Sequence, residues 1–174
     1  MWADLKKSAL LKFLVSSGVT YLILYLIYQF IVRRYTYYDQ KFIGTIITGS
    51  DYFFQLFDYK TFTSLQDRDL QVIGIDGSTG VWVGSNCNAI SLFMLFIVFI
   101  VWYPGHQTSK LWFIPFGLVT IHILNIIRVI GLVLISKNAP QYLDFNHTYT
   151  FTFIVYAYIF FLWMWWVNKF ADKK

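Results

Sequence analysis

The chain has 174 residues, of which 57% are hydrophobic, 22% are aromatic and only 13% are charged. Ordinary soluble domains carry about twice that charged fraction, so the composition excludes such a domain and favours a protein embedded in lipid. The net charge is +5, but the basic residues gather at the ends of apolar runs, a pattern typical of membrane flanks and not of a nucleic-acid partner. The length allows a single membrane domain, residues 1–174.

The first apolar run covers residues 13–32, which are 20 consecutive uncharged positions. A helix that crosses a membrane needs about 20 apolar residues, and this run lacks the small-residue cleavage site that follows a signal peptide. We therefore expect a retained transmembrane helix at 13–32, ended by Arg33 and Arg34.

The stretch 33–86 mixes charged and apolar residues, and we interpret it as an extracytoplasmic segment at the membrane surface. Residues 42–57 are apolar on average but include Asp51 and Gln55, which predicts an interfacial or re-entrant helix. Alternating β-branched residues around an Asp-Gly pair predict a β-hairpin at 71–83. This hairpin leads directly to Cys87, the single cysteine of the chain.

Three further apolar runs predict transmembrane helices at 88–103, 111–136 and 148–168. Pro104 and Gly105 separate the first two runs, and a polar link at 137–147 precedes the last. The predicted fold is an all-α integral membrane protein, a bundle of about four transmembrane helices with a short extracytoplasmic hairpin and an interfacial helix.

Basic residues close to the helix ends indicate the orientation, because cytoplasmic loops carry an excess of lysine and arginine. Seven lysines fall on the side of the two termini: Lys6, Lys7, Lys12, Lys110, Lys169, Lys173 and Lys174. Arg33 and Arg34 fall on the other side and count against this orientation. We expect both termini in the cytoplasm and the segment 33–86 outside.

Three reactive side chains fall at a similar depth on successive helices. Counted from the cytoplasmic ends of their helices, Cys87, Arg128 and His147 lie 17, 18 and 22 residues away. At about 1.5 Å per helical residue these separations are about 26, 27 and 33 Å, close to the thickness of about 30 Å of a hydrocarbon core. All three are therefore expected at the outer membrane edge, on helices that pack as neighbours.

Arg128 is the most informative of the three, because an arginine inside a spanning helix costs about 2.5–3.5 kcal/mol on insertion scales and marks a functional site. Asn125 precedes it on nearly the same helix face. If Cys87 begins a helix, the helix dipole and a nearby cation would favour its thiolate. His106 and His122 lie at other depths, and the histidines lack close spacing, so we expect no metal site and no other cofactor.

A simpler interpretation exists for each of these residues. Arg128 would extend along the helix end to lipid headgroups. Cys87 would be a small buried hydrophobe, and His147 would cap a helix at the interface.

The ordered set resembles the exosortase/archaeosortase family of membrane transpeptidases. That family has a cysteine after a hairpin, an Asn-x-x-Arg in the next helix and a histidine at the start of the following one. Here these are Val81-Trp82-Val83-Gly84-Ser85-Asn86-Cys87, Asn125-Ile126-Ile127-Arg128 and His147. The resemblance covers residues 70–168, and the short aromatic-rich chain is similar to the compact F-type exosortases of Bacteroidetes-like bacteria. The family's usual Ser-Gly after the cysteine is Asn88-Ala89 here.

The resemblance implies a cysteine protease or transpeptidase of the bacterial cytoplasmic (inner) membrane. It would cleave the C-terminal sorting helix of exported proteins and transfer the new end to an envelope acceptor, a lipid or glycan amine. Cys87 would be the nucleophile, His147 the general base and acid, and Arg128 the stabiliser of the oxyanion or thiolate. We expect Ser91 and Asn125 to line the path of the substrate helix, with Asn88 a further candidate.

Two other functions stay open. A non-catalytic membrane scaffold or small transporter subunit would use Arg128 to pair with a partner, and would tolerate lysine there. A membrane acyltransferase would depend on His147 and not on the thiol of Cys87.

Overall fold

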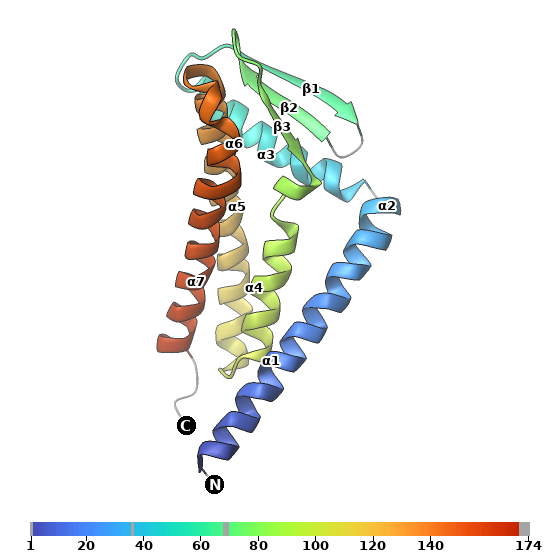
Figure 1. Ribbon diagram of the computed structural model, residues 1–174, viewed down its shortest axis with the longest axis vertical. Coiled ribbons are helices and arrows are strands. Elements are labelled where there is room, and N and C mark those ends of the chain that lie inside the picture. The colour runs from blue at the N-terminus through green and yellow to red at the C-terminus, as the bar shows by residue number, and fades with distance from the viewer. Residues whose placement is uncertain (1, 36, 68–69, 171–174) are drawn as a thin grey trace.

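The structure is a computed structural model that describes residues 2–35, 37–67 and 70–170, and it is mostly helical with one small sheet (Figure 1). Its helical elements are α1 (Trp2–Ile27), the π-helical turn η1 (Tyr28–Val32), α2 (Arg33–Tyr35), α3 (Tyr38–Gln55), the 3-10 turn η2 (Ser85–Cys87), α4 (Ile90–Trp102), α5 (Gln107–Asn138), the 3-10 turn η3 (Pro140–Tyr142), α6 (Leu143–Phe145), the π-helical turn η4 (Asn146–Thr150) and α7 (Phe151–Lys169). Its strands are β1 (Thr61–Asp67), β2 (Leu70–Ile75) and β3 (Val81–Gly84).

Three helical segments of the described chain are long and apolar enough to cross a membrane: Leu10–Val32, Gln107–Asn138 and Pro140–Lys169. The helix expected at 88–103 is shorter than predicted, because α4 spans only Ile90–Trp102, 13 residues. That length corresponds to about 20 Å, less than the roughly 30 Å of a hydrocarbon core. The chain leaves helical geometry at Ala89, whose φ of 62° is left-handed and cannot continue a right-handed helix.

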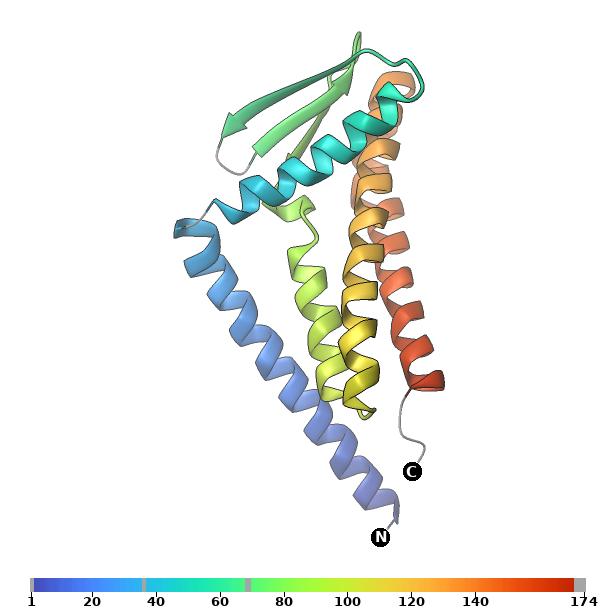
Figure 2. The same ribbon diagram turned by 180° about the vertical axis from the view of Figure 1, so that it is seen from behind.

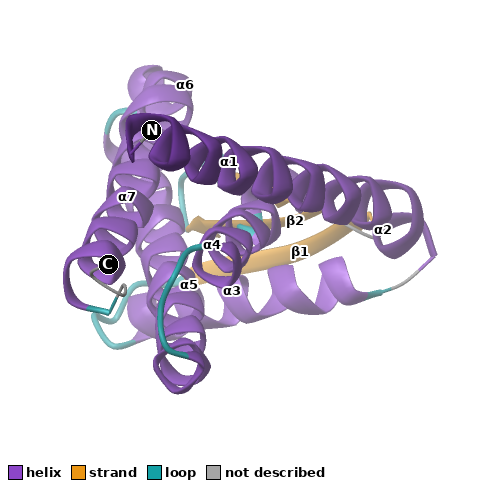
Figure 3. Cartoon of the chain, turned by 90° about the horizontal axis from the view of Figure 1, so that it is seen from below, coloured by secondary structure: helices purple, strands orange, loops and turns teal. Residues whose placement is uncertain are grey.

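The apolar helices form one bundle, and the rest of the chain covers one end of it. α4, α5 and α7 run side by side, while α1 crosses α4 obliquely (Figures 1 and 2). Seen from below, α4 lies inside the ring formed by α1, α5 and α7 (Figure 3). The start of α1 and the end of α7 lie at the same end of the molecule, and α3 with the sheet lies at the opposite end. We call α3 and the three strands the cap.

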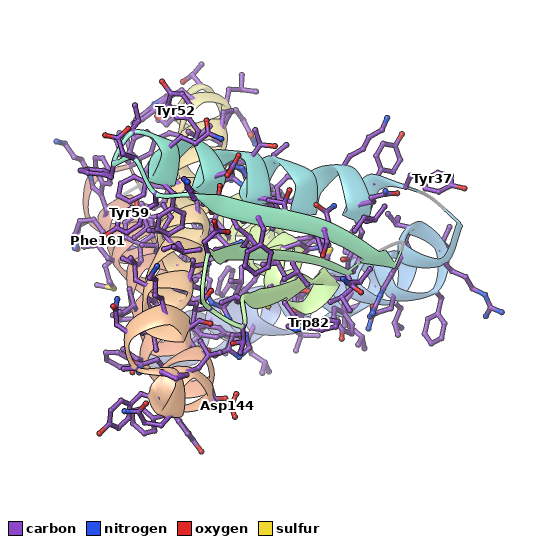
Figure 4. All side chains as sticks on the ribbon, turned by 90° about the horizontal axis from the view of Figure 1, so that it is seen from above. Tyr37, Tyr52, Tyr59, Trp82, Asp144 and Phe161 are labelled. Carbon is purple, nitrogen blue, oxygen red and sulfur yellow. The ribbon has the colours of Figure 1, made fainter. Side chains whose placement is uncertain are left out.

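The cap packs on α5 through an apolar core. The sheet has the order β1-β2-β3 with antiparallel neighbours, and along β3 the side chains of Val81 and Val83 are buried while Trp82 faces outward (Figure 4). The buried residues come from the sheet, α3 and α5: Ile43, Ile46, Ile47, Phe54, Ile73, Ile75, Val81, Val83, Val129, Ile130, Leu132 and Val133. Cys87 and Phe151 pack against this cluster, so the cap core supports the neighbourhood of the cysteine.

The cap differs from the predicted hairpin plus helix in one strand. β2 and β3 form an antiparallel hairpin that extends one residue beyond each end of the expected stretch 71–83, with Val72 opposite Trp82. α3 is the helix expected at 42–57, begun four residues earlier. β1 is not predicted, because most side chains of residues 61–67 are polar and Thr63 to Gln66 are exposed. Backbone hydrogen bonds to β2 hold this edge strand in the sheet. Backbone pairing of a mostly polar strand leaves no alternating hydrophobic pattern in the sequence.

The polar link expected at 137–147 is helical over most of its length. α5 continues to Asn138, and helical structure resumes at Pro140 and runs into α7. His147 therefore lies within a continuous helical segment and not at its first residue. The bundle helices pack through an aromatic-rich core of buried residues, namely Ala89, Phe96, Ile100, Phe113, Ile121, Val155, Ile159, Leu162 and Trp166.

A glycine allows the close packing of α4 on α5, and it yields a stability prediction. A Cβ atom built at Gly117 would overlap the ring of Phe96. We expect Gly117→Ala to lower the free energy of unfolding by about 1–3 kcal/mol, because the buried ring must shift in a close-packed core. Thermal unfolding in detergent micelles measures the change. Gly44→Ala is the matched control, since a Cβ on that helical glycine meets nothing within 4 Å; equal unfolding midpoints for the two variants would contradict the prediction.

Candidate active site

Cys87 lies where the cap meets the helix bundle. β3 ends at Gly84, and η2 carries the chain from the sheet down to α4 (Figure 1). The carbonyl oxygen of Cys87 accepts a hydrogen bond of 2.7 Å from Nδ2 of Asn125 on α5. Asn125 is 1% exposed, so this bond ties the backbone of the cysteine to the interior of the bundle. Asn125 thus acts on the backbone of Cys87, and its expected place along the substrate path stays a prediction.

Ala89 sets the direction in which the chain leaves the cysteine. Its left-handed conformation costs a residue with a Cβ atom about 1–2 kcal/mol, whereas glycine, usual here in the family that the sequence resembles, adopts it freely. α4 begins only at Ile90, so Cys87 lies at the end of a 3-10 turn and not at the first residue of a long helix.

His147 reaches Cys87 from the segment that precedes α7. Nε2 of His147 lies 3.4 Å from Sγ of Cys87, within hydrogen-bonding distance for sulfur. His147 belongs to the π-helical turn η4. Such turns are rare in proteins, and those that occur are often found at functional sites. The exposed Asp144 of α6 (Figure 4) acts on the imidazole electrostatically. The cysteine and histidine expected at one depth are thus brought into direct contact.

Arg128 lies beside this pair without bonding to it. Its charge acts on the imidazole of His147, and its Nε atom is buried with no hydrogen-bond partner. No carboxylate of the described chain forms an ion pair with it. A guanidinium is a planar set of donors that demands partners in a low-dielectric setting. An unpaired one is therefore suited to binding a negative or developing negative charge.

A cavity of about 200 Å³ lies between the first turn of α4 and the start of α7. Ser85 and Asn88, on either side of Cys87 in the sequence, line it, but Cys87 and His147 do not. Ser91, Arg128, Thr152 and Tyr156 contribute to its walls. Ser91 therefore borders a cavity, and its expected place along the substrate path stays a prediction. The cavity is large enough for a few chain atoms of a bound molecule, and Arg128 gives it a cationic wall.

Asn88 has a more specific environment than the sequence predicts. It borders the same cavity, but its amide donates to Oδ1 of Asp39 at 2.8 Å and to the hydroxyl oxygen of Tyr28 at 3.0 Å. Neither partner is among the residues singled out by the sequence. Asp39 lies seven residues after the predicted transmembrane helix 13–32. From the sequence alone it looks like any acidic residue near a helix N-terminus, where a negative charge is favourable.

The other two histidines lie away from the pair. Nε2 of His122 is 3.4 Å from Oγ1 of Thr45, and its ring packs on Phe42, while His106 precedes α5 at the opposite end of the bundle. Over the residues described here, no three His, Cys or Asp side chains come together in a way that could hold a metal ion.

The arrangement provides the parts of thiol-based acyl transfer. The described part of the chain has a thiol, an imidazole in contact with it, a guanidinium whose Nε atom is buried without a partner, and a cavity that this guanidinium lines. A nucleophile and base within hydrogen-bond reach are the common signature of covalent catalysis. Comparison of the chain with protein-family models, curated proteins and solved structures finds no significant match.

Proposed function

We propose that this protein is a membrane-embedded cysteine transpeptidase of the exosortase type. It cleaves the C-terminal sorting signal of an exported protein and transfers the new carboxyl end to an envelope acceptor amine, or to water. The observation that carries the proposal is the 3.4 Å separation of Cys87 Sγ and His147 Nε2. A scaffold or transporter subunit has no use for this contact, and an acyltransferase that depends on His147 alone has no use for the thiol.

The chemistry follows from the positions of the three side chains. His147 takes the proton of the Cys87 thiol, and the thiolate attacks the scissile carbonyl carbon to form a tetrahedral oxyanion. The unpaired Arg128 guanidinium stabilises this oxyanion, since a fixed charge in a water-poor site needs no reorganisation. The C–N bond then breaks, and the leaving amine takes the proton from His147. The acceptor amine attacks the thioester that results, giving its proton to His147, and the thiolate leaves to be reprotonated.

We place the protein in the cytoplasmic (inner) membrane of a bacterium, with both termini in the cytoplasm and the cap outside. The common location of the start of α1 and the end of α7, away from the cap, supports this topology (Figure 1), as do the lysines near those ends. Cys87 then lies at the extracytoplasmic edge of the membrane, where a protein that has just been exported arrives. A sorting helix would approach through the lipid and present its junction to Cys87, with the cavity lined by Arg128 available to the neighbouring residues.

Trapping of the acyl-enzyme tests this function. The probe is an exported reporter from the source genome that ends in a short motif, an apolar helix and a basic tail, mixed with the purified protein in nanodiscs. We expect the intact mass of the enzyme to increase by the mass of the N-terminal fragment, and neutral hydroxylamine to reverse the increase because it cleaves thioesters. A panel of such reporters that yields neither cleavage nor adduct would contradict the proposal, and an adduct that resists hydroxylamine would contradict the thioester.

A further inference from the structure

A buried polar cluster joins three separate parts of the chain immediately after the cysteine. The hydroxyl of Tyr28 donates to Oδ1 of Asp39 at 2.7 Å, and Nδ2 of Asn88 donates to both, at 3.0 and 2.8 Å. Tyr28 belongs to η1 at the end of the first helix, Asp39 to the first turn of α3, and Asn88 to the loop before α4. Exposures of 6%, 3% and 2% for Tyr28, Asp39 and Asn88 show that the cluster is buried.

The cluster acts on the backbone at Cys87 through Asn88. Oδ1 of Asn88 accepts a hydrogen bond of 3.0 Å from the backbone N–H of Ile90, which bridges the left-handed Ala89. Both ends of the Asn88 side-chain amide are thus hydrogen-bonded. Its oxygen bonds the backbone at the start of α4, and its nitrogen bonds Tyr28 and Asp39. A side chain so constrained fixes its own Cα atom, and Cys87 is the residue bonded to it.

Stability alone gives a poor reason for this cluster. Asp39 buries a carboxylate whose Oδ2 atom has no hydrogen-bond partner, and a partly satisfied buried network is less favourable than apolar packing. Strained or costly polar arrangements of this kind concentrate where geometry matters for function. The same is true of π-helical turns. The two such turns of the described chain supply two of the contacts here, Tyr28 to Asn88 and His147 to Cys87.

We infer that Asp39 is a positioning residue for Cys87: together with Tyr28, it holds Asn88 so that the thiol stays in contact with His147. The inference rests on the proposed function for its catalytic meaning, but its physical content concerns the thiol alone. Asp39 makes no hydrogen bond to Cys87 within the described chain, and it acts on the cysteine through its bond to Asn88.

Because Cys87 is the single cysteine, its reactivity can be measured without any substrate. Alkylation by iodoacetamide, followed by intact mass over a range of pH, reports how readily the thiol loses its proton. An ordinary thiol is only a few per cent ionised at pH 7, so contact with His147 should make the wild-type protein react faster near neutral pH. We expect Asp39→Ala to react about tenfold more slowly at pH 7, with a profile moved toward that of a free thiol.

Two companion variants keep the test decisive. Asp39→Asn retains a carbonyl oxygen that can accept from both Tyr28 and Asn88, so we expect a profile near that of the wild type. Tyr28→Phe leaves the charge of Asp39 in place and removes only the hydroxyl; we expect it to move the profile in the direction of Asp39→Ala. Tyr28→Phe also serves if Asp39→Ala does not fold.

Thr20→Val is the matched control for loosening the first helix. It removes the hydrogen bond of 3.0 Å that Trp102 Nε1 donates to Thr20 Oγ1. This bond joins α1 to the end of α4 that is far from Cys87. We expect an unchanged alkylation profile. The inference is overturned if Thr20→Val slows alkylation as much as Asp39→Ala does, or if folded Asp39→Ala and Tyr28→Phe match the wild type at every pH. A slowed Asp39→Ala in a protein that processes no sorting signal would uphold the positioning role and reject the proposed function.

Discussion

Replacing Cys87 with alanine is expected to abolish processing of a sorting-signal reporter, with a fall in rate on the order of 10⁴-fold or more, as when the nucleophile of a catalytic triad is removed. The physical reason is that, among the described residues, only the Cys87 thiol is hydrogen-bonded to the imidazole of His147. No other side chain can therefore replace it as the nucleophile in the covalent step. Cys87 is only partly buried, and its loss should leave folding intact. The measurement is the ratio of mature to precursor reporter on a gel, beside the unfolding midpoint of the variant.

A double variant of Cys87 and His147 tests whether the loss of processing comes from catalysis. Cys87→Ala combined with His147→Gln should be no worse than Cys87→Ala alone, because residues that act as one unit cannot be lost twice. His122→Gln is the matched control, since His122 lies elsewhere in the bundle against Thr45 and Phe42; we expect it to process normally. If Cys87→Ala continued to mature the reporter while His147→Gln did not, the chain would be an acyltransferase of the kind that needs only the imidazole.

The second large effect is expected at Arg128. Arg128→Leu should lower the processing rate by about 10²–10³-fold, the range found when an enzyme loses one donor to a developing oxyanion. The same substitution should increase the amount of protein in the membrane, because removing an arginine from a spanning helix recovers about 2.5–3.5 kcal/mol on insertion scales. Processing rate per molecule and membrane abundance, measured on the same preparation, should therefore move in opposite directions.

Lysine at the same position separates a catalytic guanidinium from a simple positive charge. Arg128→Lys keeps the charge and loses the planar set of donors, so we expect most of the activity to be lost. Lys137→Leu removes a cation from the exposed end of the same helix, where it bonds the carbonyl of Asp76, and should process normally. Full processing by Arg128→Lys would contradict a role for the planar guanidinium and show that a positive charge at this position is sufficient.

The two π-helical turns illustrate why part of the site escapes prediction. A helix rise of about 1.5 Å per residue is enough to place Cys87 and His147 at one depth, because depth along a helix depends only on residue counts. Rotation about the helix axis does not follow from such counts. η1 and η4 change that rotation locally, and they point Tyr28 and His147 toward the loop after β3.

Asp39 gives the clearest case of a residue that only folding reveals. It is separated from Asn88 by 49 positions, and the intervening chain contains α3, the whole sheet and the turn into the bundle. An aspartate at the start of a helix is locally ordinary. Its burial and its two hydrogen bonds exist only because α3 packs across the end of the bundle.

The sequence by itself determined the apolar character, three of the long helices, the hairpin, and the order in which thiol, guanidinium and imidazole occur. These follow from composition and local periodicity, which are properties of neighbouring residues. Tertiary structure decided the short α4, the edge strand β1, the contact between Cys87 and His147 and the cluster that holds Asn88. Each of these depends on pairs of groups distant along the chain, and the free energy of such pairs is realised only after the helices have packed.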